Sequence, residues 1–86
     1  MSDNIEDTVR SILSDMLGLS AAQVAAMDGD TELFGALPEL DSMAVAGLLT
    51  EMEDRLGIMI DDDDVDGELF ETFGNLVAFA KAKVAG

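Results

Sequence analysis

An Asp41–Ser42 pair stands in "PELDSM", residues 38–43, where a loop containing the chain's one proline meets a long apolar run. The chain has no cysteine and no histidine, so a thiolate nucleophile and the commonest general base are both absent. The chain therefore has few side chains that could take part in catalysis. Serine is also a favoured N-cap residue, so Ser42 is either a helix cap or the functional centre of the protein.

A second chemical grouping is the acidic run "DDDVDG", residues 62–67, whose aspartates alternate before a glycine. This spacing matches the first half of an EF-hand calcium loop. The twelfth position of such a loop, residues 62–73, needs a bidentate glutamate, and Phe73 stands there. We therefore expect no dedicated metal site, only loose divalent binding or a solvated acidic surface. Crowding of like charges in the run is expected to raise its carboxylate pKa values.

Charge limits the classes of partner. Nineteen acids against four bases give a formal net charge of −15, which argues against nucleic acid and against an anionic membrane surface. The field favours partners with basic patches. No apolar stretch is long enough for membrane insertion, and "MSDNIEDTVR" has acids where a signal peptide has bases, so a cytoplasmic protein is expected.

Apolar residues at three- and four-residue steps predict the elements that position these groups. They indicate helices over residues 4–17, 42–56 and 73–84, the last after a cap at Thr72, and a short helical turn over 20–26. The fold expected is all-α, a small four-helix bundle of three main helices and one short helix, as a single domain over residues 1–86. The long loop between the first two main helices is expected to pack four apolar residues against the core: Leu33, Phe34, Leu37 and Leu40. The connection over 58–71 is expected to hold one short helical turn.

The first half of the helix over 42–56 is apolar all round. Met43, Ala44 and Gly47 have no obvious polar side, so they are either core or an exposed surface for a partner. Acids follow in the second half of the helix, at Glu51, Glu53 and Asp54. We expect these six residues to form a docking face, where apolar contact gives affinity and the acids steer basic partners.

Two stretches resemble the acyl carrier protein family. "LDSMAVAGLLTEMEDRLGIMI", residues 40–60, is similar to the attachment motif of that family followed by its recognition helix. "IEDTVRSILSDMLGLSAAQV", residues 5–24, is similar to the family's first helix and the turn after it. The likeness covers nearly the whole chain.

The resemblance implies a carrier and not an enzyme. Ser42 would carry 4′-phosphopantetheine through a phosphodiester, and the thiol of this arm would hold acyl groups as thioesters. Asp41 would help a phosphopantetheinyl transferase, the holo-carrier synthase, to bind its magnesium and substrate. The other partners implied are acyl-loading and acyl-processing enzymes with basic docking patches, acting on a monomer. A chain without cysteine or histidine also has no nucleophile of its own to attack a bound thioester.

The sequence departs from the family's fatty-acid-type members at two places. Ala44 and Gly47 stand where those carriers usually have acids, and "GALPELDS" replaces the commoner "DLGADS" form. Both differences favour a specialised lipid or acyl-transfer pathway. The alternative is a non-enzymatic acidic interaction or divalent-ion-binding module, with the partial EF-hand loop over 62–73 and Ser42 as a cap only.

Overall fold

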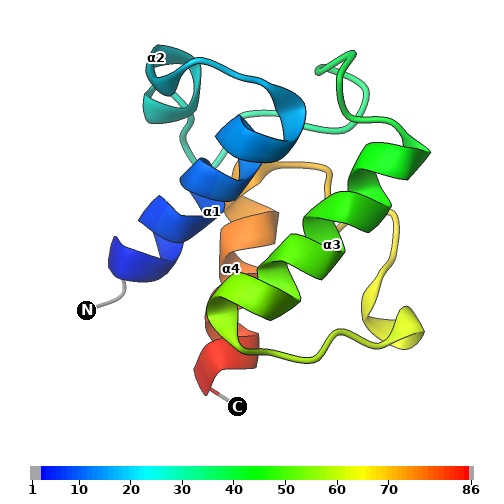
Figure 1. Ribbon diagram of the computed structural model, residues 1–86. Helices are drawn as coiled ribbons and strands as arrows, with labels where there is room; N and C mark the ends of the chain where they lie inside the picture. Colours follow the sequence, from blue (N-terminus) through cyan, green and yellow to red (C-terminus); the bar gives the residue numbers. More distant parts are fainter. Residues whose placement is uncertain (1–2, 86) are drawn as a thin grey trace.

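Three helices pack around one core in the computed structural model, which describes residues 3–85 (Figure 1). Helix α1, Asp3–Leu17, packs against helix α3, Ser42–Leu56, and both contact helix α4, Phe73–Ala85. The short helix α2, Ala21–Ala25, follows α1, and a single 3-10 turn, η1, Asp62–Asp64, lies between α3 and α4. The predicted all-α bundle is confirmed. No helix within residues 3–85 has the length and apolar character needed to cross a membrane.

Local sequence signals account for the ends of the helices. Ser20 and Gln23 form a reciprocal capping box at the start of α2, where each side chain accepts the other residue's backbone N–H. The Thr72 hydroxyl accepts the Asn75 N–H at 3.1 Å and caps α4. Gly57 ends α3 with φ of 65°, a left-handed conformation that glycine adopts at little cost.

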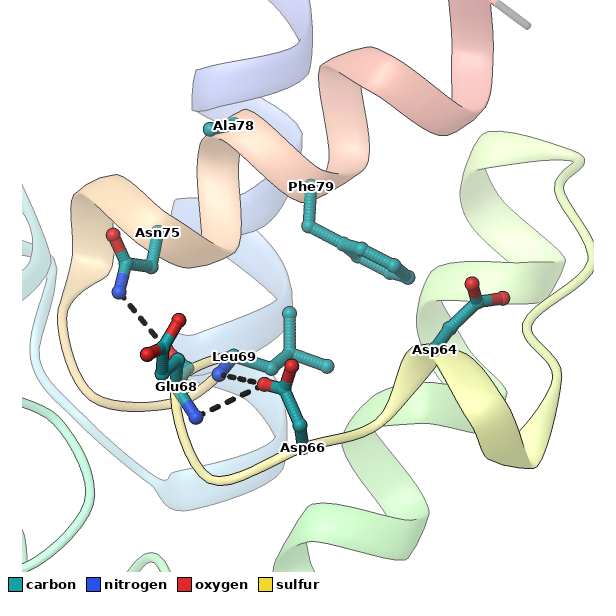
Figure 2. Close-up of a pocket in the computed structure, with 7 residues that line it drawn as sticks. All are labelled: Asp64, Asp66, Glu68, Leu69, Asn75, Ala78 and Phe79. Carbon is teal, nitrogen blue, oxygen red and sulfur yellow. Dashed lines mark hydrogen bonds between the residues drawn. The ribbon is translucent and has the colours of Figure 1, made fainter.

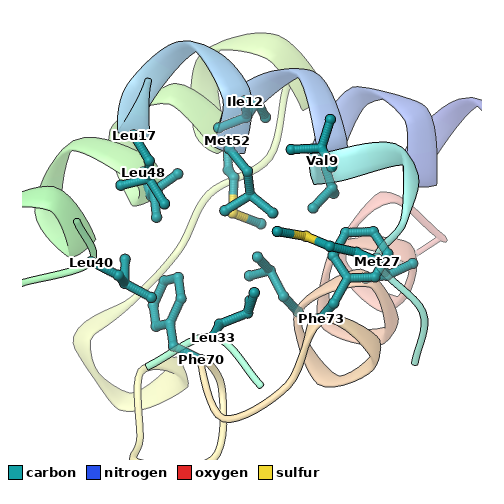
Figure 3. Close-up of a cluster of buried hydrophobic side chains, with 14 of the residues drawn as sticks. Val9, Ile12, Leu17, Met27, Leu33, Leu40, Leu48, Met52, Phe70 and Phe73 are labelled. Carbon is teal, nitrogen blue, oxygen red and sulfur yellow. The ribbon is translucent and has the colours of Figure 1, made fainter. Parts of the chain in front are cut away.

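The core gathers apolar side chains from every main helix and from both long connections (Figure 3). Its largest fully buried members are Val9, Ile12, Leu13, Leu33, Leu48, Met52, Phe73 and Leu76. Leu33 and Leu40 bring the loop before α3 into this core, and Leu37 packs at its edge, as predicted. The expectation for Phe34 is wrong, because its side chain is 56% exposed.

The loop before α3 is fastened to the end of the α3–α4 connection by backbone hydrogen bonds. The Leu33 and Phe34 N–H groups donate to the carbonyls of Glu71 and Phe70, at 3.1 and 2.8 Å. In return, the N–H of Phe73 donates to Thr31 at 2.8 Å, and the N–H of Gly74 donates to Gly29 at 3.2 Å. This antiparallel pairing holds the loop before α3 against the connection that follows α3. It thereby fixes the position of both segments relative to the start of that helix.

Candidate functional site

The residues at the start of α3 have separate structural roles. Asp41 is the N-cap, and its Oδ1 accepts the Ala44 N–H at 2.9 Å. Ser42 is the first residue of the helix itself, and its side chain is exposed. In the part of the chain that the structure describes, no hydrogen bond engages the Ser42 hydroxyl. The interpretation of Ser42 as a helix cap is therefore wrong, since Asp41 holds that position.

Ser42 is one of the residues that line a groove of about 260 Å³. Its lining comes from the loop before α3, from α3 and from the α3–α4 connection: Phe34, Ser42, Val45, Val65, Asp66, Gly67 and Phe70. Four of these side chains are apolar, and Asp66 is the one ionisable group among them. The groove could therefore shelter an uncharged or apolar group that is held near the hydroxyl.

The predicted docking residues differ in exposure. Met43 is 85% exposed, whereas Ala44 and Gly47 are half-buried. Gly47 lies against α1, because a Cβ atom at this position would stand 2.9 Å from the Met16 Cε. The exposed Met16 side chain thus continues the apolar surface from α3 onto α1.

Two of the three acids in the second half of α3 are engaged within the fold. Glu51 pairs with Arg55 at 3.0 Å, and Arg55 also reaches Asp15 of α1 at 2.8 Å. The hydrogen bonds with Asp15 and then Glu51 raise the pKa of Arg55. Glu53 Oε2 accepts the Ile60 N–H at 2.8 Å. Asp54 is exposed, and within residues 3–85 no side-chain hydrogen bond or ion pair holds it.

The aspartates after α3 do not converge on a cation position. Asp66 Oδ1 accepts the N–H groups of Glu68 and Leu69, both at 3.0 Å, while Asp64 lies apart from Asp66 (Figure 2). Asp64 Oδ2 pairs with Lys83 Nζ at 2.6 Å. No group of three or more carboxylates in the described residues is placed to hold a metal ion.

Asp64 corrects the expectation about crowded charges. The hydrogen bond from Lys83, followed by the one from the Asp61 backbone, lowers the pKa of the Asp64 carboxyl from its ordinary 3.8. The expected rise is therefore wrong at this position. These two hydrogen bonds to the charged form outweigh the effect of burial, which by itself would raise the pKa of the Asp64 carboxyl.

Sequence reasoning missed the groove beside Ser42. The sequence predicts Phe34 in the core, and it assigns no part in the site to Phe70 or Val65. Val65 is an apolar residue within the acidic run and Phe70 follows it closely, a pattern that indicates a segment in contact with an apolar surface.

Comparisons with known proteins agree with this geometry. Residues 7–80 match the family described as "Phosphopantetheine attachment site". The chain is 38% identical over 61 residues to an acyl carrier protein of Nitratidesulfovibrio vulgaris, an overlap of 71% of this chain and 75% of that protein. It is 38% identical over 69 residues to a D-alanyl carrier protein of Enterococcus faecalis, covering 80% and 83%. The solution structure of a holo acyl carrier protein from Nitrosomonas europaea matches with a TM-score of 0.84 at 36% identity, over 95% and 96% of the two chains.

Proposed function

Because this chain belongs to the acyl carrier protein family, whose members have a phosphopantetheine attachment site, we propose that Ser42 is its point of attachment. The chain is a carrier protein and not an enzyme, and 4′-phosphopantetheine is the group that it holds covalently. When bound, this group supplies the thiol that a cysteine-free chain lacks, and acyl cargo is held on that thiol as a thioester. The observation that carries the proposal is the exposed Ser42 side chain, whose hydroxyl has no hydrogen bond within residues 3–85, beside a cap that Asp41 already provides.

The residues around Ser42 fit such a group. The first turn of a 15-residue helix presents backbone N–H groups and the positive end of the helix dipole, which favour a phosphate. Asp41 uses one carboxylate oxygen on the Ala44 N–H, and the N–H groups of Ser42 and Met43 stay available. Phe34, Val45 and Phe70 offer apolar surface for the uncharged part of the arm or for its cargo.

The partners follow from the surface of α3. A phosphopantetheinyl transferase and the acyl-loading and acyl-processing enzymes dock on the exposed Met43 and its half-buried neighbours Ala44 and Gly47. The acids further along the helix steer partners with basic patches, and they are Glu51, Glu53 and Asp54. Asp41 assists the transferase from its cap position.

The pathway is a specialised one for lipid or acyl transfer. Ala44 and Gly47 leave the first half of the docking face without charge, so apolar contact dominates there. The match to a D-alanyl carrier protein shows that similar chains include carriers of a non-fatty acyl group. An uncharged docking face suits a dedicated set of partner enzymes.

Intact-mass measurement tests the attachment residue. The chain is incubated with coenzyme A, magnesium and a broad-specificity phosphopantetheinyl transferase. The wild-type protein should gain one phosphopantetheinyl group, Ser42→Ala should gain none, and Ser11→Ala, which removes another exposed serine, should behave as wild type. Modification that persists in Ser42→Ala would overturn the assignment.

A further inference from the structure

An acidic segment, residues 61–68, forms one wall of the groove beside Ser42, and we name this segment the acidic strap. Val65, Asp66 and Gly67 of the strap line the groove together with Ser42. The strap holds six acids among eight residues and has one half-buried apolar side chain, Val65. Val65 packs against the edge of the core, and the rest of the strap is held by polar contacts with other elements.

Behind the strap lies a second hollow, which separates it from α4 (Figure 2). This hollow measures about 240 Å³ and is lined by Asp64, Asp66, Glu68, Leu69, Asn75, Ala78 and Phe79. Asp66 lines both hollows, so the strap is a thin partition between them. Because there is open space on both sides, the strap can shift while the fully buried core side chains stay in place, and only Val65 at the edge of the core moves with it.

Lys83, on α4, forms the ion pair that links the acidic strap to this helix. Its Nζ lies 2.6 Å from Asp64 Oδ2, and the two side chains are only 26% and 28% exposed. The Lys83 ammonium also lies 5.9 Å from the centre of the Phe79 ring, a wall residue of the hollow. Among residues 3–85, no other cationic side chain pairs with the strap, because Arg10 and Arg55 pair elsewhere and Lys81 forms no ion pair there.

The other ties act at the two ends of the strap. Before it, the Ile60 N–H donates to Glu53 of α3. At its far end, the Asn75 side chain donates to the Glu68 carbonyl at 2.9 Å, and the buried Leu69 follows. Between these ends, the Lys83–Asp64 ion pair and the packing of Val65 against the core hold the strap where it forms the groove wall.

We propose that Lys83 is a positioning residue for the attachment site, holding the acidic strap in place as the wall of the groove at Ser42. The inference deepens the proposed function and rests on it, because it concerns the shelter given to a group attached at Ser42. When the Lys83 charge is lost, by substitution or by acylation of its amine, the acidic strap is no longer held to α4 at this point. The wall of the groove can then move. The attached arm is then less sheltered, although the helices stay packed.

Hydrogen exchange in the unmodified chain tests the tie itself. Lys83→Met keeps the apolar stem and removes the charge, and Lys83→Arg restores the charge. Lys81→Met is the matched control, since it removes the same charge from α4 on a side chain without a partner in the described residues. Lys83→Met should speed exchange of the Asp64 and Val65 amides, which bond to Asp61 and Asp62, by roughly two- to fivefold. Lys83→Arg and Lys81→Met should match wild type, and the amides of α1 should not change.

Thiol reactivity of the arm-bearing protein tests the consequence at the site. An uncharged maleimide should react with the thiol faster in Lys83→Met than in wild type, Lys83→Arg or Lys81→Met. Equal exchange in Lys83→Met and Lys81→Met, a rise that extends through α1, or an unchanged thiol rate would each overturn the proposal. If no protein accepts the arm at Ser42, the proposed function fails, and the exchange result shows separately whether the tie exists.

Discussion

At the start of α3, Asp41 caps the helix and Ser42 presents an exposed hydroxyl. The Asp41 carboxylate satisfies a backbone N–H of α3, and this leaves the Ser42 hydroxyl without a structural partner in the described chain. A serine that capped the helix would have its oxygen engaged by backbone, and a transferase would have to break that bond. This division of roles therefore keeps the helix stable while the hydroxyl stays available.

The first prediction follows from this division. Asp41→Ala should lower the free energy of unfolding by about 1 kcal/mol, the usual loss for an N-cap. Ser42→Ala should change it by less than about 0.5 kcal/mol, as expected for an exposed side chain whose hydroxyl has no hydrogen bond in the described residues. Urea denaturation of both variants against wild type measures this. The reverse order of effects would return the cap to Ser42.

A second prediction concerns pH and Asp64. Because the folded-state pKa of Asp64 is lowered below 3.8, its pairing with Lys83 stabilises the fold above that pH. The contribution is lost as pH falls through the folded-state pKa, when the carboxylate takes up a proton. The difference in melting temperature between wild type and Lys83→Met should therefore be present at neutral pH and vanish well below pH 3.8. A difference that stays constant over this range would mean that Lys83 acts through packing alone.

At the scale of the elements, α3 shows what sequence can predict. Its predicted range, residues 42–56, matches the observed helix, because the signals are local: an Asp-Ser start, an apolar repeat and Gly57 at the end. The short turns and the Thr72 cap were predictable for the same reason. Local chemistry of this kind acts over three or four residues and is written in the sequence directly.

The parts that escaped prediction depend on residues far apart in the chain. The bond from the Phe34 N–H to Phe70 turns the Phe34 side chain toward the groove and away from the core. The pairing of Lys83 with Asp64 likewise joins two elements. Backbone bonds between distant loops use groups that every residue has, so they leave no compositional trace. The sequence therefore predicts the part of the candidate site at the start of α3, but it does not predict the groove beside it.

The docking face gives the third prediction. Asp54 is the acid on α3 without a side-chain hydrogen bond or ion pair in the described residues, whereas Glu51 and Glu53 also hold the fold together. Asp54→Lys should slow phosphopantetheinyl transfer by a few fold at low salt and flatten its salt dependence, because it weakens the attraction to a basic partner. Asp7→Lys, the same charge change at an exposed position of α1, is the control. Equal effects of both variants would assign the steering to net charge instead of α3.

Close packing between backbones gives the fourth prediction. A Cβ atom at Gly74 would stand 2.6 Å from the Gly29 carbonyl oxygen, and backbone cannot rotate away from it. Gly74→Ala should therefore lower the free energy of unfolding by roughly 1–3 kcal/mol, despite alanine's higher helix propensity. Gly67→Ala is the control, because a Cβ atom there meets nothing within 4 Å. Thermal or urea unfolding measures both, and equal stabilities would show that the two segments can separate without cost.

For the whole molecule, the balance of nineteen acids and four bases governs the response to ions. Added salt should raise the melting temperature, because screening reduces repulsion among the unpaired acids. Calcium and magnesium should act alike, since no described group of carboxylates is placed to hold a cation. Salt should at the same time speed exchange in the acidic strap by weakening the Lys83–Asp64 pair. Calorimetry that finds one saturable micromolar calcium site, unmatched by magnesium, would contradict this.

The pairing of residues 29–34 with 70–74 also has a consequence for the order of folding. Its hydrogen bonds join positions about forty residues apart, so closing them costs chain entropy that the contacts inside a helix do not. Helices α1 and α3 lie as far apart in the chain, but their association buries large apolar side chains, whereas this pairing is made by four backbone hydrogen bonds. We therefore expect α1 and α3 to associate first and this pairing to form after the rate-limiting step. Gly74→Ala should then speed unfolding while it leaves the refolding rate nearly unchanged. The last part of the chain to become ordered would be the part that frames Ser42, so a nascent carrier would gain its groove only when the rest of the bundle is complete.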